Sequence, residues 1–441
     1  MQAAETLPVG VLRAKAESLD NSILFDIHKD YEAMPAFDIV STVLQAISPH
    51  LGLRLKRDLK LYKRNLKTVL VNLFVAWDNH HSTWVAYSRD SNQYKAGSRY
   101  NKLGISRVVI QIMDALRAAG LVETVNGFKD RGTGIGKTSR MRATDTLAGI
   151  FFDAALVRAF VVREVEEIVL RGPKASKRPG LALEYEDTAR TKAMRRVIRR
   201  INEALRAGNI TLDITIAERE ALKLRLGHEI DQTRTQLQRV FNEGWDRGGR
   251  LYRHWAQELP KEFRPRLRIN GNRVTEQDYG GLHIRLLYAI SGQGQPDGDV
   301  YAIPVLAGAS ADTWRDKCKI VLQAVINAPD MENAVRGAVK GLNDKGLKTN
   351  RKEVEWMVQA LKKKHEPVKQ FFNSGYGSAL QKTDSDMAVD ILSDLLDKGI
   401  VALPIHDSFV VERQHKAALV DAMNRAFFGR FGVAPKIGEK Y

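Results

Sequence analysis

Two short stretches, far apart in the chain, constrain the fold most strongly, because each delivers a single carboxylate at the end of a strand-like segment. Asp407 stands between two apolar runs, which is typical of a tight turn between two buried strands. Asp278 ends another strand-like segment, Gly280 and Gly281 interrupt it, and an apolar helical period begins at Leu282. Two such carboxylates repel each other unless divalent cations lie between them, as in two-metal phosphoryl transfer, where the ions are about 3.5–4 Å apart. Taken alone, either aspartate is more simply interpreted as a turn or cap residue.

Five blocks of sequence, in order, resemble the polymerase core of family A DNA polymerases and of their relatives, the phage-type single-subunit RNA polymerases. The segment DYGGLHIR, residues 278–285, is similar to motif A of that family, DYSxxExR. The segment IHDS, residues 405–408, is similar to motif C, which is His-Asp-Glu in the DNA enzymes and His-Asp-Ser in the RNA enzymes. The resemblance covers roughly residues 248–441. It implies a right-hand polymerase fold, with reduced fingers because the interval between motifs A and C is short.

The resemblance also assigns roles within motifs A and C. Asp278 and Asp407 would bind two Mg²⁺ ions, with Mn²⁺ as a substitute, and the backbone carbonyl of Tyr279 would be a further ligand. His283 stands where the DNA enzymes have a glutamate that obstructs the 2′-hydroxyl of a ribonucleotide, so the sugar preference stays open. Arg285 would belong to the primer–template contacts.

A third block, RDKCK at residues 315–319, resembles the start of motif B, Arg-x-x-x-Lys. Residues four apart share one face of a helix, so Arg315 and Lys319 would both face a nucleoside triphosphate. Both cations would offset charge on the leaving pyrophosphate, and Lys319 would also protonate it. Asn327 replaces the family's tyrosine, so the aromatic platform under the base pair is missing or supplied elsewhere. Without this context, such a pair is more often a surface pair.

Two further blocks resemble segments that contact the primer and template. Arg250, in GGRLY, would bind the minor-groove edge of the primer end, although Gly248 replaces the family's threonine. Gln381 would contact the primer–template minor groove, and His406 would touch the primer terminus. Asp386, close to Gln381, is interpreted as a structural or capping residue.

Composition narrows the class of partner. The net charge of +17 and the isoelectric point near 9.7 favour a polyanion, with nucleic acid more consistent than a membrane surface. A single cysteine, Cys318, excludes an internal disulfide and a Cys-based zinc site, and suits a reducing cytoplasm. The sequence has no signal-peptide pattern at Met1 and no apolar stretch near 18 residues, so no membrane partner is expected.

The N-terminal part predicts a compact DNA-binding module. A helical period over residues 106–119 is followed by a strand at 121–125, an Asn-Gly turn and a basic strand at 139–142. Helix followed by a basic hairpin resembles the winged helix-turn-helix of plasmid replication initiators. The expected phosphate contacts are Arg107, Lys129, Arg131, Lys137 and Arg140. A basic α/β module without a DNA role is the alternative.

The glycine-rich segment GTGIGKT, residues 132–138, is not a nucleotide-binding P-loop. It has three residues between its glycines where that motif needs four, and a basic strand follows where a long helix is required. Downstream, one basic helix passes through Ile201 and Leu205, and a second is predicted from Ala217 to about Phe241. These resemble a thumb that grips duplex DNA, although a solvated charged face explains them equally well.

The sequence therefore predicts an α+β chain. Its expected parts are an N-terminal segment (1–36), a winged-helix domain (37–151), a linker (152–184), thumb-like helices (185–245), palm with motif A (246–310), reduced fingers (311–375) and palm with motif C (376–441). The expected function is addition of nucleotides from nucleoside triphosphates to a 3′-hydroxyl, on a DNA primer–template or single strand, in a mobile or plasmid-like replication system. Two alternatives remain: a primase or RNA-synthesising enzyme, and a catalytically inactive replication initiator that only binds DNA.

Overall fold

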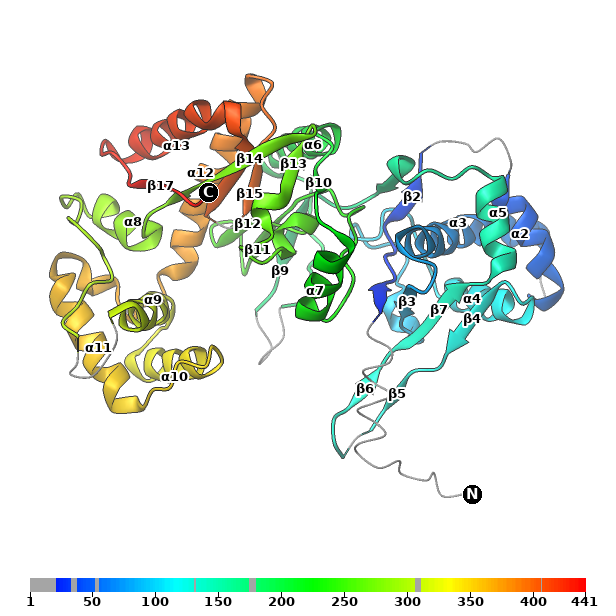
Figure 1. The fold of residues 1–441 in the computed structure, drawn as a ribbon, viewed down its shortest axis with the longest axis horizontal. Helices are drawn as coiled ribbons and strands as arrows, with labels where there is room; N and C mark the ends of the chain where they lie inside the picture. Colours follow the sequence, from blue (N-terminus) through cyan, green and yellow to red (C-terminus); the bar gives the residue numbers. More distant parts are fainter. Residues whose placement is uncertain are drawn as a thin grey trace. The chain divides into compact units, whose positions relative to one another are not determined.

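The structure, a computed structural model, describes residues 21–32, 38–51, 55–130, 132–173, 180–305, 311–405 and 407–441. Two residues predicted to contact nucleic acid, Arg131 and His406, lie outside the described residues. The chain is α+β and divides into two compact units (Figure 1). Unit 1 comprises Met1–Glu166, Asp213–Gln236 and Arg253–Leu259, and unit 2 comprises Glu167–Leu212, Leu237–Tyr252 and Pro260–Tyr441. No described helix is both long enough and apolar enough to cross a bilayer.

Unit 1 is organised around one long helix, α3. Its residues Leu66, Val69, Leu70 and Leu73 recur at three- and four-residue spacing, and all four are buried because this spacing puts them on one helix face. Helices α2, α4 and α5 and strands β3 and β7 contact α3. The helices are α2 (Ile39–Ile47), α3 (Leu55–Asn79), α4 (Val108–Ala118), α5 (Asp145–Asp153) and α7 (Ile216–Leu226).

The strands of unit 1 form one four-stranded sheet and two pairs. The sheet has the order β1-β3-β7-β4, with β1 parallel to β3 and the other pairs antiparallel. The pairs are β2–β8 and β5–β6. The bounds are β1 (Ser22–Leu24), β2 (Lys29–Tyr31), β3 (Trp84–Tyr87), β4 (Val122–Val125), β5 (Phe128–Lys129), β6 (Gly136–Lys137), β7 (Ser139–Ala143) and β8 (Val161–Arg163).

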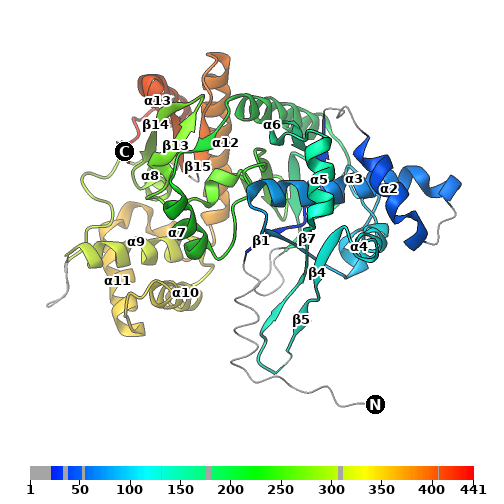
Figure 2. The same cartoon turned by 45° about the vertical axis from the view of Figure 1, so that its right-hand side comes forward.

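The predicted helix and strands of the N-terminal module are present as α4, β4 and β7, but the turn predicted at Asn126 and Gly127 is wrong, because the chain runs through these residues into β5. Between them, β5 and β6 continue the hairpin away from the sheet, as Figures 1 and 2 both show. Gly136 and Lys137 form strand β6, and strand β7 follows. The glycine-rich segment is therefore a hairpin tip that no helix follows, which agrees with the rejection of a P-loop.

Unit 2 contains the sheet that carries the two aspartates. Its strand order is β10-β13-β14-β16-β15, with β17 also paired to β14, and all pairs are antiparallel. Helix α12 contacts β15, and helix α13 contacts β14 and β16. All five residues of β16 are buried, which explains its apolar sequence. The strands are β10 (Thr211–Leu212), β13 (Leu267–Ile269), β14 (Asn272–Tyr279), β15 (Leu403–Ile405), β16 (Ser408–Glu412) and β17 (Ile437–Glu439).

In the described part of unit 2, a second sheet and seven α-helices complete the fold. The sheet has the order β12-β11-β9. Helices α9, α10 and α11 pack on one another and lie side by side in both views (Figures 1 and 2). The elements are β9 (Ile168–Arg171), β11 (Gln238–Asn242), β12 (Gly248–Tyr252), α6 (Ala189–Ala207), α8 (Leu282–Ile290), α9 (Ala311–Asn327), α10 (Met331–Asn343), α11 (Arg351–Lys364), α12 (Gly377–Asp397) and α13 (Lys416–Phe431).

The second basic helix is shorter than predicted, so the expectation of one helix from Ala217 to Phe241 is wrong. Helix α7 begins with a capping box between Thr215 and Glu218 and ends at Gly227, which adopts a left-handed φ of 73°. Residues 228–237 of the predicted helix are irregular, and its last residues belong instead to strand β11. Helices α6 and α7 also belong to different compact units.

Candidate active site

Strand register brings the two predicted metal-binding aspartates together. Strands β14 and β16 are antiparallel neighbours, and Asp278 pairs with Ser408 in their register. Asp407 directly precedes Ser408, in the two-residue connection between β15 and β16. Burial, followed by the charge of Asp407, raises the pKa of Asp278 to about 6. The two carboxylates thus form one electrostatically coupled pair.

The Asp278 carboxylate has an unsatisfied oxygen. Its Oδ1 atom is buried and accepts no hydrogen bond from any described residue, and the ammonium of Lys440 lies 3.5 Å away. A buried oxygen beside a second carboxylate is a donor set that suits a hard divalent cation such as Mg²⁺, which commonly uses one or two carboxylates and fills its other positions with water and phosphate. Within the described ranges, no group of three or more His, Cys, Asp or Glu side chains is arranged to hold a metal.

Tyr279 contributes its backbone to this region and its side chain to the core. Its hydroxyl donates a 2.6 Å hydrogen bond to the backbone oxygen of Met423, and its ring is buried. Beyond it, Gly281 begins α8 with a left-handed φ of 66°. A Cβ atom there would lie 2.7 Å from Val300, so only glycine fits where the chain turns from β14 into α8. This turn brings His283 to the site.

His283 belongs to a buried network with Arg250 and Asp384. Arg250 donates two hydrogen bonds, of 2.7 and 2.9 Å, to one carboxylate oxygen of Asp384, and it lies 3.0 Å from Nε2 of His283. Burial and the Arg250 charge lower the pKa of His283 to about 4, so its ring is neutral and Nε2 accepts from the guanidinium. Gly249 allows strand β12 to pack closely against helix α12, because a Cβ atom at its φ of 79° would lie 2.7 Å from Ser385 of α12.

Asp407 connects this network with the acidic pair. Burial raises the pKa of Asp384 to about 6 against the opposing Arg250 charge, and the charge of Asp407 adds to the rise. The Asp407 charge also acts on Arg250 and His283. It also acts on Tyr301, whose pKa burial and Asp407 raise to about 12. The structure therefore gathers residues from β12, β14, α8, α12 and the segment before α9 around one aspartate.

Asp384 and Tyr301 are site residues that the sequence analysis missed. Asp384 stands three residues after Gln381 on α12, a spacing that puts both on one side of the helix and was an available signal. Tyr301, between α8 and α9, had no predicted role. Gln381 itself is half-buried. Asp386 forms ion pairs with Arg239 and Lys382.

The predicted triphosphate pair lies on one helix, as expected, but only one member reaches the site's edge. Arg315 lies over the ring of Tyr301, 5.2 Å from its centroid, and forms a 2.6 Å ion pair with Asp299. Lys319 is exposed one turn further along α9. Asn327 ends α9, donates to the backbone oxygen of Gln323 and packs against Gly377. Its position is thus the junction of α9 and α12.

Two predicted nucleic-acid contacts are instead internal. Arg285 is buried, and its guanidinium donates to the backbone oxygens of Gly280, Pro296 and Gly298 at 2.9, 3.0 and 3.4 Å. It therefore holds the segment after α8 rather than facing a primer. In unit 1, Arg140 is 4% exposed and donates to the backbone oxygen of Thr138. Its burial corrects its expected role as a phosphate contact.

The remaining cations of the hairpin module are accessible. Arg107 is exposed at the start of α4, Lys129 is exposed on β5, and Lys137 is half-buried on β6. The three side chains thus lie on the helix and the hairpin that were predicted to carry DNA contacts. Comparison of the chain with protein-family models and with curated proteins finds no match.

Proposed function

We propose that unit 2 is the catalytic unit of a nucleic-acid polymerase of the family A type, which transfers a nucleotide from a nucleoside triphosphate to a 3′-hydroxyl. The observation that carries the proposal is the β14–β16 register, which sets Asp278 beside Asp407 and leaves a buried carboxylate oxygen without a hydrogen bond. In a structural ion pair a cation would balance each carboxylate, whereas the Lys440 ammonium, 3.5 Å from Oδ1 of Asp278, is shared with Glu276. An adjacent carboxylate pair in which burial and like charge raise the pKa of Asp278 is better explained by a divalent cation that binds between the two groups.

In this proposal Asp278, Asp407 and the backbone carbonyl of Tyr279 would hold Mg²⁺. When bound, the ions supply a lower pKa for the attacking hydroxyl and positive charge beside the leaving pyrophosphate. His283 stays neutral beside Arg250, so it adds no positive charge that would compete with a metal ion at the acidic pair.

The side chains of α9 supply the remaining positive charge for the triphosphate. The Arg315–Asp299 pair is half-exposed, and such pairs contribute little stability, so the guanidinium can exchange Asp299 for a phosphate oxygen. Lys319, on the same side of α9, is the proposed donor of a proton to pyrophosphate. Helices α9, α10 and α11 would then serve as reduced fingers beside a palm formed by the β14–β16 sheet.

The DNA-binding part of the proposal rests on unit 1. Its exposed cations on α4 and β5, together with the net charge of +17, favour a partner with a phosphate backbone. The helix and long hairpin support a winged-helix module that would bring DNA to unit 2. The system served would be mobile or plasmid-like replication.

RNA synthesis is the second candidate, and Ser408 favours it. Ser408 occupies the position that a glutamate has in the DNA enzymes, and its hydroxyl donates a 2.5 Å hydrogen bond to Glu276. The residue that directly follows Asp407 therefore carries a hydroxyl group and no carboxylate. The neutral His283 likewise replaces the glutamate that obstructs a ribose 2′-hydroxyl.

A primer-extension assay with dNTPs and NTPs in separate reactions, with and without template, tests both candidates. Asp278→Asn and Asp407→Asn should lower incorporation by about 10³-fold or more, because each removes a metal-binding charge. Asp390→Asn, an exposed position on α12, is the matched control and should retain activity. No incorporation by the wild-type chain, with DNA binding intact, would instead favour an inactive initiator.

A further inference from the structure

The segment after α13 brings one more charged side chain to the acidic pair. Strand β17 pairs with β14 so that Gly438 stands opposite Asp278, and the Lys440 amide donates a 2.9 Å hydrogen bond to the backbone oxygen of Glu276. Side chains two residues apart on a strand share a face. Lys440 therefore faces the same side as Glu276 and Asp278, and Gly438 leaves the space beside Asp278 open.

The ammonium of Lys440 lies between two carboxylates. Its Nζ is 3.0 Å from Oε1 of Glu276 and 3.5 Å from Oδ1 of Asp278. Glu276 is fully buried, and Arg264 at 3.1 Å and the Ser408 hydroxyl at 2.5 Å also donate to its Oε1. Arg264 also balances the charge of Glu276, so the Lys440 ammonium is not needed there alone. Among the described residues, Lys440 is the cation that forms an ion pair with Asp278.

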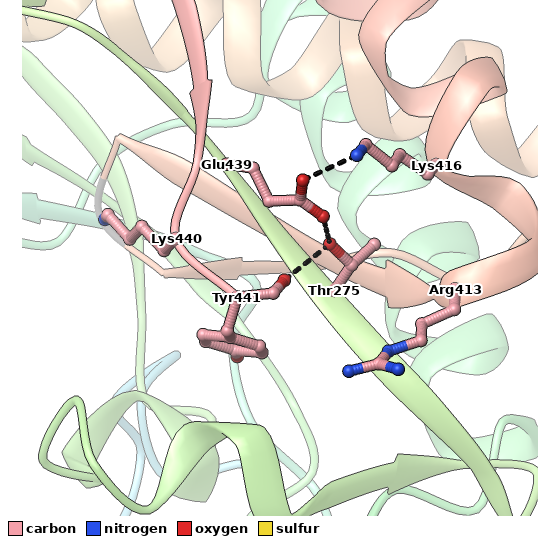
Figure 3. A pocket seen from close by; sticks show the side chains of 6 residues that line it. All are labelled: Thr275, Arg413, Lys416, Glu439, Lys440 and Tyr441. Atoms are coloured by element: carbon pink, nitrogen blue, oxygen red, sulfur yellow. Dashed lines mark hydrogen bonds and ion pairs between the residues drawn. The ribbon is translucent and has the colours of Figure 1, made fainter.

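The neighbouring lysine of this region is used differently. Lys416 forms a 2.6 Å ion pair with Glu439, the residue before Lys440. Figure 3 shows these two side chains directed toward each other, while the Lys440 side chain points away from them. The adjacent residues Glu439 and Lys440 thus form ion pairs in opposite directions, and of these two residues Lys440 is the one that reaches the candidate site.

We propose that Lys440 is a positioning residue of this site, whose ammonium holds the Asp278 carboxylate in place and competes with the divalent cation for it. The inference rests on the proposed function, since it takes Asp278 as a metal ligand. A fixed positive charge a few ångströms from a divalent cation opposes its binding. Lys440 therefore raises the cation concentration at which the site fills.

Mn²⁺ binding to the full chain, followed by the electron paramagnetic resonance signal of the free ion, measures this without any need for catalysis. We expect Lys440→Gln to lower the Mn²⁺ midpoint by about tenfold, whereas Lys440→Arg, which keeps the charge, stays within about twofold of wild type. Lys416→Gln removes the same charge from the neighbouring ion pair and should also stay within about twofold. Asp278→Asn identifies the binding that belongs to this site.

The other outcomes distinguish failure of the Lys440 inference from failure of the proposed function. If Asp278→Asn removes binding but Lys440→Gln binds Mn²⁺ no more tightly than wild type, the Lys440 inference fails and the proposed function stands. If wild type and Asp278→Asn bind alike, both fail. Hydrogen exchange across residues 437–439 shows whether β17 stays paired, and Lys440→Met gives a second neutral variant that must reproduce the shift.

Discussion

The two units bury carboxylates in opposite ways. In unit 1, Asp26 forms a 2.6 Å ion pair with Arg163, and Asp231 forms a 2.7 Å ion pair with the fully buried Lys29. These cations, against the opposing effect of burial, lower the pKa of both carboxyl groups. In unit 2, burial and a neighbouring carboxylate raise the pKa of Asp278. The two ion pairs of unit 1 each match a carboxylate with a cation, whereas the candidate site of unit 2 sets the Asp278 carboxylate beside a like charge.

Under the proposed function, this difference separates charges that stabilise a fold from charges that would bind a cation. A matched buried pair leaves little for an outside group to bind, and its loss exposes an uncompensated charge to the core. A mismatched pair is unfavourable in the isolated chain and becomes favourable only when a cation arrives. The protein therefore accepts a local cost in unit 2, which is expected at a functional site and has no purpose in a purely structural core.

Removal of a matched partner should have the largest effect on stability. Asp231→Ala leaves the Lys29 ammonium buried without a counterion, and we expect the free energy of unfolding of unit 1 to fall by about 3–5 kcal/mol. Urea unfolding, with hydrogen exchange to assign the loss to unit 1, measures the change. Asp114→Ala breaks the exposed Arg89–Asp114 pair, also 2.7 Å long, and should cost no more than about 1 kcal/mol. Equal losses would remove burial as the distinction.

A buried histidine in unit 1 gives the next largest effect. His254 is 1% exposed, its Nε2 has no described hydrogen-bond partner, and burial lowers its pKa to about 3. The unfolded chain binds a proton near pH 6.5, so the wild-type stability should fall as pH drops from about 6.5 toward 3, by at most roughly 1.4 kcal/mol per pH unit.

His254→Asn should remove this part of the pH dependence, because asparagine does not titrate. Its side-chain oxygen can replace Nδ1 as the acceptor from Ala256. His81→Asn, at an exposed position, is the control and should leave the slope unchanged. Unfolding midpoints measured across this pH range test the prediction. If stability depends on pH as steeply in His254→Asn as in wild type, the prediction is wrong.

In unit 2, replacement of an aspartate of the acidic pair should raise the free energy of unfolding, whereas in unit 1 replacement of Asp231 should lower it. Asp407→Asn removes one of two like charges, so the metal-free protein should gain about 1 kcal/mol while it loses catalysis. Thermal unfolding without Mg²⁺ measures this gain, and thermal unfolding with Mg²⁺ measures whether the metal ion still binds. Mg²⁺ should raise the wild-type midpoint and leave the variant unchanged, since a ligand stabilises only the state that binds it. A loss of several kcal/mol, as expected for Asp231→Ala, would make this aspartate structural.

Local sequence patterns predicted where the elements of the site begin and end. The apolar runs around Asp407 and the glycines after Asp278 gave the turn, the strand end and the following helix as the structure has them. The resemblance to polymerases, rather than any local pattern, predicted that the two aspartates meet. Their meeting depends on register between strands far apart in the chain, which residue periodicity does not encode.

The misplaced arginines and the missed Asp384 have the same non-local origin. Nothing local distinguishes the buried Arg140 and Arg285 from exposed arginines, because their burial depends on which distant elements cover them. Asp384 became part of the site only because Gly249 lets β12 approach α12. The predicted helix over Gly227 failed for a local reason, since glycine at a left-handed φ ends a helix whatever the charge pattern that follows.

The smallest expected effect contrasts two basic residues of unit 1. Lys129 is exposed on β5, so Lys129→Ala should weaken binding of a short DNA duplex only a few-fold and reduce the slope of log affinity against log salt by about 1. Arg140 is buried, so Arg140→Ala should lower the stability of unit 1 and leave the salt slope of the folded protein unchanged. Fluorescence anisotropy over a range of salt concentrations measures both. A reduced slope in folded Arg140→Ala would mean that this guanidinium reaches phosphate after all, and that burial alone does not separate structural from binding charges in unit 1.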